Sequence, residues 1–317
     1  LILFGQGNKS VGTIVAISSY ASYFWQPIMN LGNIFNNFIN NIAYLERIFE
    51  TMDEPVTVKD AKDAVEMPKI RGEVTFDHVN FSYDASKQIL NDVSFTVKPG
   101  ESVALVGPTG AGKSTIVNLI SRFYNVNGGR VLIDGQDISQ VTIHSLREQM
   151  GIMMQDSFIF SGDIEDNIRY GKLDATLEEI VNASKTVCAD EFISKMPDGY
   201  QTEVRERGSM LSQGQKQLIS FARTLLSDPA ILILDEATSS IDVQTEKALQ
   251  TGLNAMLKGR TSFIIAHRLS TIRNCDKIMY IDNGGIMESG THDELMAKKG
   301  YYYKLYTAQL DEVQKAG

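Results

Sequence analysis

Residues 107–115 limit the possible folds of this chain more than any other stretch, because they spell G-x-x-x-x-G-K-S followed by threonine. A buried-strand pattern precedes them at residues 102–106, and an apolar, helix-like run follows at residues 116–120. In this strand–loop–helix context, glycines let backbone N–H groups turn inward, and the helix N-terminus adds partial positive charge. The pattern therefore predicts a phosphate loop that binds a nucleotide, rather than a glycine-rich turn with a chance lysine.

Individual side chains of the phosphate loop have distinct expected roles. Lys113 can reach the β- and γ-phosphates, and the Ser114 hydroxyl can ligate Mg²⁺. Backbone groups along the loop supply the remaining phosphate contacts. The residues expected to contact the nucleotide here are Gly107, Pro108, Thr109, Gly110, Ala111, Gly112, Lys113, Ser114 and Thr115.

A second signal lies at residues 231–236, where four apolar residues precede two carboxylates. The apolar run predicts a buried strand, and ligands of open α/β sheets bind beyond the carboxyl ends of such strands. We expect Asp235 to hold Mg²⁺ through its water shell and Glu236 to orient or deprotonate an attacking water. An acidic pair at an ordinary strand end is the alternative, and the preceding phosphate loop makes it the weaker one.

Composition narrows the class of protein. The chain has 317 residues, 43% hydrophobic and 22% charged, which is typical of a globular protein of one large or two modest domains. Its net charge of −9 argues against an extended nucleic-acid surface. Cys188 and Cys275 lie far apart without a C-x-x-C pattern, so we expect neither a disulfide framework nor a zinc site, and a reducing setting fits.

The N-terminal stretch differs from the rest of the chain, since residues 10–45 contain no charged side chain. Residues 11–31 are mainly apolar and about 20 long, enough to cross a bilayer, with Pro27 as a possible kink. Lysine and arginine are richer after this segment than before it, so the positive-inside tendency predicts a cytoplasmic C-terminal side. The chain begins with Leu1, and we expect it to be a fragment.

Residues 31–49 have two faces. Leucine, isoleucine and phenylalanine recur at spacings of three and four, while asparagines gather on the opposite side. An asparagine face is costly in lipid and is expected to point at other helices or a wet cavity. This polar half, with the length of the segment, excludes a signal peptide. An amphipathic helix packed on a soluble domain remains the alternative to a membrane helix.

The remaining pattern is that of an α/β domain. Residues 51–70 carry prolines and charges without an apolar period, so we interpret them as a linker. Residues 73–83 alternate like a strand, but the phase slips between Phe76 and Val79, which predicts a bulge. Helical patterns dominate residues 162–226, and Thr291 with Glu294 forms a capping box opening a short helix. Further strands are expected at residues 93–97, 130–133, 151–154, 261–265 and 277–281.

The chain resembles the C-terminal part of an ATP-binding cassette (ABC) exporter subunit over nearly its whole length. Besides the motifs above, residues 211–217 (LSQGQKQ) resemble the family's signature motif, and residues 239–242 resemble its D-loop. Gln155 resembles the Q-loop glutamine, His267 the switch histidine and Tyr83 the adenine-stacking aromatic. The order and spacing of these motifs make the resemblance highly specific.

The resemblance implies a P-loop NTPase fold: a RecA-like core with an antiparallel β subdomain and a helical subdomain, preceded by a transmembrane helix. It divides the chain into the end of a transmembrane domain (1–50), a linker (51–70) and a nucleotide-binding domain (71–317), whose helical subdomain spans about 162–226. The expected reaction is hydrolysis of ATP with Mg²⁺, coupled to export of a substrate across the cell membrane. The nucleotide-binding domain would be cytoplasmic.

The resemblance also assigns roles to residues. Glu236, His267 and Gln155 would be catalytic, and Ser114, Gln155 and Asp235 would hold the metal. Beyond the phosphate loop, Tyr83 would stack on adenine, while Ser212, Gly214 and Gln215 would contact ATP held by a second nucleotide-binding domain. Two such domains must then dimerise head-to-tail, as a homodimer or a heterodimer.

Two positions depart from the family pattern. Gln213 stands where the signature motif usually has glycine, which is expected to tune ATP affinity. Arg205 stands where the segment resembling the X-loop more often has glycine, which puts the coupling contacts of that segment in doubt. Three alternative functions stay open: a soluble cassette ATPase acting on nucleic acid or the ribosome, the non-hydrolysing half of a heterodimer, and a regulatory role that no residue supports.

Overall fold

The computed structural model describes residues 11–84, 87–154, 157–235, 243–266 and 269–316. The chain forms two compact units, Leu1–Thr57 and Val58–Gly317, and each is described by itself.

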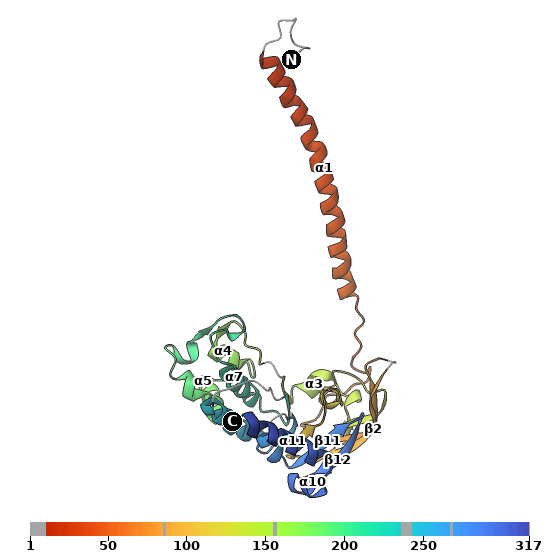
Figure 1. Ribbon diagram of the computed structural model, residues 1–317, viewed down its shortest axis with the longest axis vertical. Helices are drawn as coiled ribbons and strands as arrows, with labels where there is room; N and C mark the ends of the chain where they lie inside the picture. The colour runs from red at the N-terminus through yellow and green to blue at the C-terminus, as the bar shows by residue number, and fades with distance from the viewer. Residues whose placement is uncertain (1–10, 85–86, 155–156, 236–242, 267–268, 317) are drawn as a thin grey trace. The chain divides into compact units, whose positions relative to one another are not determined.

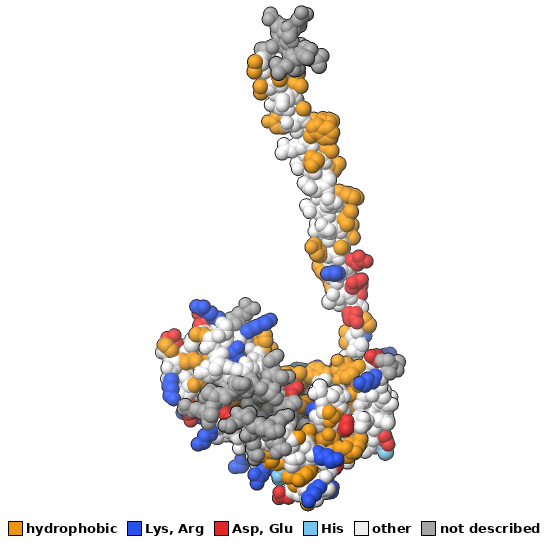
Figure 2. Space-filling model, viewed as in Figure 1, with side chains coloured by type: hydrophobic (Ala, Val, Ile, Leu, Met, Phe, Trp, Pro, Cys, Tyr) orange, Lys and Arg blue, Asp and Glu red, His pale blue; other side chains and the backbone are white. Residues whose placement is uncertain are grey.

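The first unit consists of one long helix, α1 (Val11–Met52), which is continuous through Pro27. All of its residues are exposed, and hydrophobic side chains cover much of its length, with charged side chains near its C-terminal end (Figure 2). Among the described residues, no helix combines the length and the apolar character that a membrane crossing requires. The helix expected at residues 11–31 is therefore present, but the expected span is not supported, since serines and Asn30 dilute its apolar residues.

The second unit is built on a six-stranded sheet with the order β12-β11-β3-β10-β9-β6. Strands β11, β3, β10, β9 and β6 are parallel neighbours, and only the edge strand β12 is antiparallel. Every residue of β3 and β10 is buried, as the apolar runs predicted. The strands are β3 (Ser102–Val106), β6 (Met150–Met153), β9 (Ile231–Asp235), β10 (Thr261–Ile265), β11 (Lys277–Asp282) and β12 (Gly285–Gly290).

A second, antiparallel sheet has the order β2-β1-β4-β5. Its first strand carries the predicted bulge, because the pairing register shifts between Phe76 and Val79 and His78 adopts φ 52°. The strands are β1 (Val74–Ser82), β2 (Gln88–Val97), β4 (Gly128–Ile133) and β5 (Gln136–Asp137). This sheet is the antiparallel β subdomain expected from the resemblance.

Helices cover both faces of the main sheet. Ala104 and Val106 of β3 pack into one hydrophobic cluster with the helical region, whereas Val103 and Leu105 pack into another with α2 and the antiparallel sheet. Helices α4, α5 and α7 gather at one end of this unit, as Figure 1 shows. The helices are α2 (Lys113–Ile120), α3 (Ile143–Arg147), α4 (Ile164–Arg169), α5 (Leu177–Thr186), α6 (Asp190–Ile193), α7 (Gln213–Leu226), α8 (Val243–Leu257), α9 (Leu269–Arg273), α10 (His292–Lys298) and α11 (Tyr301–Ala316).

The predicted helical region thus contains α4 to α7, together with the short strands β7 (Gly162–Asp163) and β8 (Glu203–Val204). The predicted capping box is also present: the Thr291 hydroxyl accepts from the Glu294 N–H, and the Glu294 carboxylate accepts from the Thr291 N–H. A mixed α/β core with helical and antiparallel parts confirms the expected fold class.

Candidate nucleotide site

The phosphate loop connects β3 to α2, as the strand–loop–helix pattern predicted. Gly112 immediately precedes α2 and has φ 107°, a backbone conformation that residues other than glycine rarely adopt. Gly107 begins the loop with φ 139°, and a Cβ added there would meet the carbonyl oxygen of Ile281 at 2.0 Å. The neighbouring strand β11 therefore leaves room only for glycine at the first position of the loop.

Lys113 is the first residue of α2 and is 9% exposed. Its Nζ donates to the carbonyl oxygens of Gly107 and Pro108, both at 2.8 Å, so the ammonium group folds back over the loop. Burial lowers the pKa of Lys113, and the Asp235 carboxylate opposes this effect. The charge of the aspartate in the second motif therefore acts on the lysine of the first.

The first turn of α2 presents two hydroxyl groups. Ser114 is exposed, whereas Thr115 is 4% exposed and its Oγ1 lies 3.1 Å from the Tyr83 hydroxyl. The first N–H groups of a helix have no partner within that helix and favour anionic ligands. This helix end is therefore suited to a phosphate group.

Tyr83 belongs to an aromatic cluster next to the phosphate loop. Its ring is 4.9 Å from that of Phe81 and 4.9 Å from that of Tyr124, both edge-to-face. The Tyr83 side chain is half-exposed, as a stacking surface for a planar base requires. Tyr124 was not predicted as part of the site; it directly follows Phe123 after α2, and that aromatic pair was the available signal.

Asp235 ends β9, where it pairs in register with Ile265 of β10. A small cleft, partly open to solvent, borders Asp235 and is lined by Met153, Phe221 and Leu234 among others. The strand order β3-β10-β9-β6 places the carboxyl ends of these parallel strands at one edge of the sheet. Asp235 and the phosphate loop share that edge, where α/β proteins bind ligands.

The expected catalytic residues Gln155, Glu236 and His267 lie outside the described residues, as does the D-loop at 239–242. The strands that end just before the three are described: β6 ends at Met153, β9 at Asp235 and β10 at Ile265. All three strands are parallel neighbours.

The segment that resembles the signature motif opens α7. Ser212 caps this helix: its hydroxyl accepts from the Gln215 N–H at 3.2 Å, and the Gln215 side chain accepts from the Ser212 N–H at 2.9 Å. Ser212 is exposed, Gly214 is buried, and Gln213 is partly buried at the first helical position. Ser212 therefore lies at the N-terminus of α7.

The described residues of the predicted nucleotide and metal site therefore fall into two groups. Tyr83, Thr115, Lys113 and Asp235 interact around the phosphate loop, whereas Ser212 and Gln215 bond to each other at the start of α7. Arg205, the second departure, is exposed and precedes a short 3₁₀ turn. Its exposure allows contact with another chain or domain.

Comparison with known proteins agrees with this geometry. The profile of the family described as "ABC transporter" matches residues 90–239. The ABC transporter ATP-binding protein YknV of Bacillus subtilis is 52% identical over 300 residues, covering 95% of this chain and 50% of that protein. The fatty acid ABC transporter ATP-binding/permease protein of Mycobacterium bovis is 44% identical, covering 95% of this chain and 48% of that protein.

A solved structure, a bacterial Atm1-family ABC exporter with ATP bound, is 41% identical with a TM-score of 0.78, and the match covers 96% of this chain and 54% of that one. The chain spans about half the length of the curated relatives it matches. Together with the phosphate loop, Asp235 and the helix-capping LSQGQ segment, these matches establish that the chain belongs to the ABC transporter family and carries its ATP-binding domain.

Proposed function

We propose that this chain binds Mg·ATP and hydrolyses it, and that the energy drives export of a substrate across a membrane. The observation that carries the proposal is the phosphate loop on β3 and α2, with the Lys113 ammonium group folded over it and within reach of the Asp235 charge. Phosphoryl transfer to water depends mainly on positioning and charge neutralisation, and both groups suit that task.

The residues around Lys113 fit a magnesium ion. Mg²⁺ is bound by oxygen ligands, with one or two carboxylates and several waters. The exposed Ser114 hydroxyl and the Asp235 carboxylate offer such oxygens beside the loop, and Gln155 is the third proposed ligand. When bound, the ion would neutralise charge on the phosphate oxygens.

The proposed catalytic roles follow the motifs. Glu236 would orient or deprotonate the attacking water, and His267 would donate a hydrogen bond to the γ-phosphate. Tyr83 would stack on the adenine, supported by its half-exposed ring and its contact with Thr115. Lys113 would exchange its two neutral carbonyl acceptors for phosphate oxygens, which is favoured because the new acceptors carry negative charge.

We further propose that a second nucleotide-binding domain completes each site. Within the part of the chain that the structure describes, Ser212 and Gln215 bond to each other on α7 and not to the phosphate loop, which favours a role in binding ATP held by a partner. The exposed Ser212 hydroxyl and the N-terminus of the 14-residue helix α7 suit a phosphate. Whether the partner is a second copy or a different chain depends on the complete protein.

The proposal of export and of a membrane location rests on relatives and on α1. One relative is an ATP-dependent lipid A-core flippase of Syntrophus aciditrophicus, 41% identical over 307 residues. Helix α1 exposes large apolar side chains along its whole length, including Trp25 and Phe35, and such surfaces mark interaction sites. We propose that α1 ends a transmembrane domain, packs against further helices and is followed by a cytoplasmic nucleotide-binding domain.

The second candidate function is that of the subunit of a heterodimeric transporter that does not hydrolyse ATP. Such a subunit commonly lacks the carboxylate after the aspartate of the second motif, whereas this chain has Glu236. A soluble cassette ATPase is the third, and the exposed apolar surface of α1 argues against it.

The test is the ATPase rate of the protein, purified alone in a membrane mimic, against Glu236→Gln. Glu178→Gln makes the same chemical change on the exposed surface of α5 and is the matched control. We expect the rate to fall by at least about 100-fold in Glu236→Gln and to stay unchanged in the control. A wild type that binds ATP without hydrolysing it would favour the non-hydrolysing subunit.

A further inference from the structure

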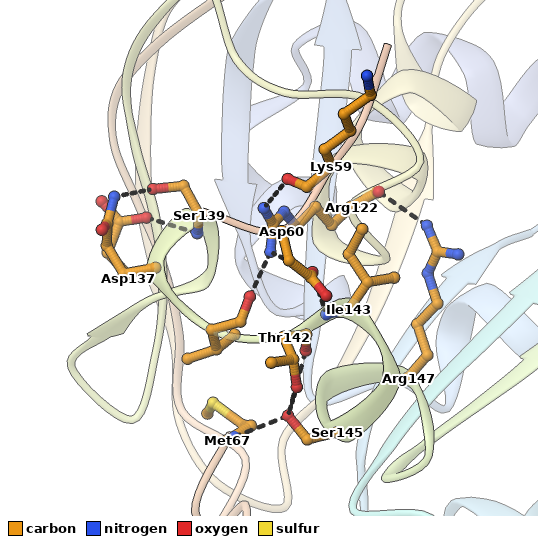
Figure 3. Close-up of polar contacts among 12 residues, drawn as sticks. Lys59, Asp60, Met67, Arg122, Asp137, Ser139, Thr142, Ile143, Ser145 and Arg147 are labelled. Carbon is orange, nitrogen blue, oxygen red and sulfur yellow. Dashed lines mark hydrogen bonds and ion pairs between the residues drawn. The ribbon is translucent and has the colours of Figure 1, made fainter. Parts of the chain in front are cut away.

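Arg122 is a buried arginine just beyond the helix that carries the phosphate loop. It is 2% exposed, and burial lowers the pKa of its guanidinium group. Its Nη1 donates to the Val141 carbonyl at 2.5 Å and its Nη2 to the Lys59 carbonyl at 3.0 Å (Figure 3). Among the described residues, no acceptor pairs with its Nε. Burying an arginine with an incomplete set of hydrogen-bond partners costs desolvation energy, so its presence is not explained by stability alone.

The backbone of Arg122 also ends α2. Its N–H donates to the Leu119 carbonyl, and the Phe123 N–H donates to the Asn118 carbonyl, which together form a Schellman motif. Arg122 occupies the left-handed position of this motif with φ 52°, where glycine is usual. The side chain is therefore fixed to the end of α2 opposite the phosphate loop.

A second arginine holds the same helix end. Arg147 of α3 donates from Nε to the Ser121 carbonyl at 3.0 Å and from Nη2 to the Arg122 carbonyl at 2.8 Å. Cations at a helix C-terminus interact favourably with its dipole. Arg147 thus braces the turn that carries Arg122 (Figure 3).

The Lys59 carbonyl, which accepts from Arg122, belongs to residues 58–72. We call these residues the connecting segment because they lie between α1 and the first strand of the second unit. Although we predicted a linker here, the segment is fastened to the domain along its length. The Val65 N–H donates to the backbone carbonyl of Gln140. The Met67 N–H donates to Ser145 Oγ at 2.8 Å, and the Ile70 N–H donates to Gln149 Oε1 at 2.8 Å.

Asp60 adds a second tie at the start of the connecting segment. Its Oδ1 accepts from the Ile143 N–H at 2.8 Å, supplying the cap that Thr142 does not give α3. The same oxygen lies 4.0 Å from Arg122 Nη1. Arg122 therefore contacts the connecting segment through the Lys59 backbone and, more weakly, through the Asp60 charge.

We propose that Arg122 is a positioning residue that transmits nucleotide occupancy from the phosphate loop, through α2, to the connecting segment. The helix has only eight residues, and its buried residues pack it into the core, so it moves as one body. A phosphate group drawn onto its N-terminus displaces its C-terminus, and Arg122 carries the displacement to Lys59. This inference rests on the proposed binding of ATP.

The test is amide hydrogen exchange of residues 58–67, with and without Mg·ATP, in the wild type and in Arg122→Met. We expect Mg·ATP to slow exchange in this segment by about threefold or more in the wild type, and to leave it unchanged in Arg122→Met. Arg130→Met is the matched control, because Arg130 is exposed and pairs with Asp77 at 2.6 Å, and it should keep the wild-type response. ATP affinity is measured on the same samples.

The outcomes separate the two proposals. A wild type that does not bind ATP contradicts the proposed function. A wild type that binds ATP without a change in the segment, or an Arg122→Met protein with the full response, overturns the role of Arg122. Should Arg122→Met not fold, Asp60→Ala, which alters the partly exposed side of the same contact, should at least halve the response, and an unchanged response would overturn the inference equally.

Discussion

The Tyr83 hydroxyl lies 3.1 Å from Thr115 Oγ1 and thereby joins the residue just after β1 to the first turn of α2. The antiparallel sheet supplies the aromatic ring, and the main sheet supplies the phosphate loop. Under the proposed function, the base and the phosphates of one nucleotide would thus contact two different layers of the domain.

The ring of Tyr83, rather than its hydroxyl, is expected to bind the base. Tyr83→Ala should weaken ATP binding by about 1–2 kcal/mol, roughly 5- to 30-fold in Kd. Tyr83→Phe keeps the ring, loses only the bond to Thr115, and should stay within about threefold of the wild type. Isothermal titration with ATP checks both. Equal losses in the two variants would mean that the hydroxyl matters more.

Gly107→Ala is expected to abolish ATP binding. The new Cβ would lie 2.0 Å from the Ile281 carbonyl oxygen, so either the loop or β11 must move. We expect destabilisation of about 1–3 kcal/mol as well. The control is Gly135→Ala, at a turn with φ +80° where a Cβ meets nothing within 4 Å. Urea unfolding and nucleotide binding measure the two effects; ATP binding of wild-type strength in Gly107→Ala would contradict this account.

Much of the domain could be predicted because its signals are local. The apolar run at residues 261–265 matches β10, and the phase slip between Phe76 and Val79 corresponds to the bulge of β1. Strand β12 was missed because Glu288 and glycines break its apolar alternation, and it forms by pairing with β11.

The connecting segment shows which contacts local reasoning cannot supply. Its proline and its charges indicate irregular backbone, but two of its N–H groups donate to side chains of Ser145 and Gln149, far along the chain. No periodicity records such contacts. The same holds for Tyr124, whose place beside Tyr83 depends on the packing of α2 against the antiparallel sheet.

Asp235 is expected to set the magnesium requirement of ATP binding. Asp235→Asn removes the carboxylate beside Lys113, so the Mg²⁺ concentration for half-maximal ATP binding should rise about tenfold. Asp282→Asn makes the same change at the end of β11, where the carboxylate accepts from the Asn283 N–H, and should leave it unchanged. Titration with Mg²⁺ at fixed ATP distinguishes the two. An equal rise in both variants would contradict a specific metal role.

His292 is expected to make stability depend on pH. Its Nδ1 lies 2.7 Å from the Tyr302 hydroxyl, and burial lowers its pKa below the ordinary 6.5. The unfolded state therefore binds more protons below about pH 6.5, and the free energy of unfolding falls as pH falls through that value toward the folded pKa. Urea unfolding at about pH 7.5 and 5.5 should give a smaller difference in His292→Gln than in the wild type. His144→Gln, at a 90% exposed side chain, should retain the wild-type difference.

Ser212 is expected to serve both its own helix and the nucleotide of a partner, and a matched pair of caps separates the two roles. Ser212 with Gln215 on α7 and Thr176 with Glu179 on α5 form the same capping box within the helical region. Ser212→Ala and Thr176→Ala should each reduce the free energy of unfolding by about 1 kcal/mol. Only Ser212→Ala should also reduce the ATPase rate, because its hydroxyl would contact phosphate in the dimer. Unfolding curves and ATPase rates of both variants give the answer: if the two lose activity equally, the serine acts only as a helix cap.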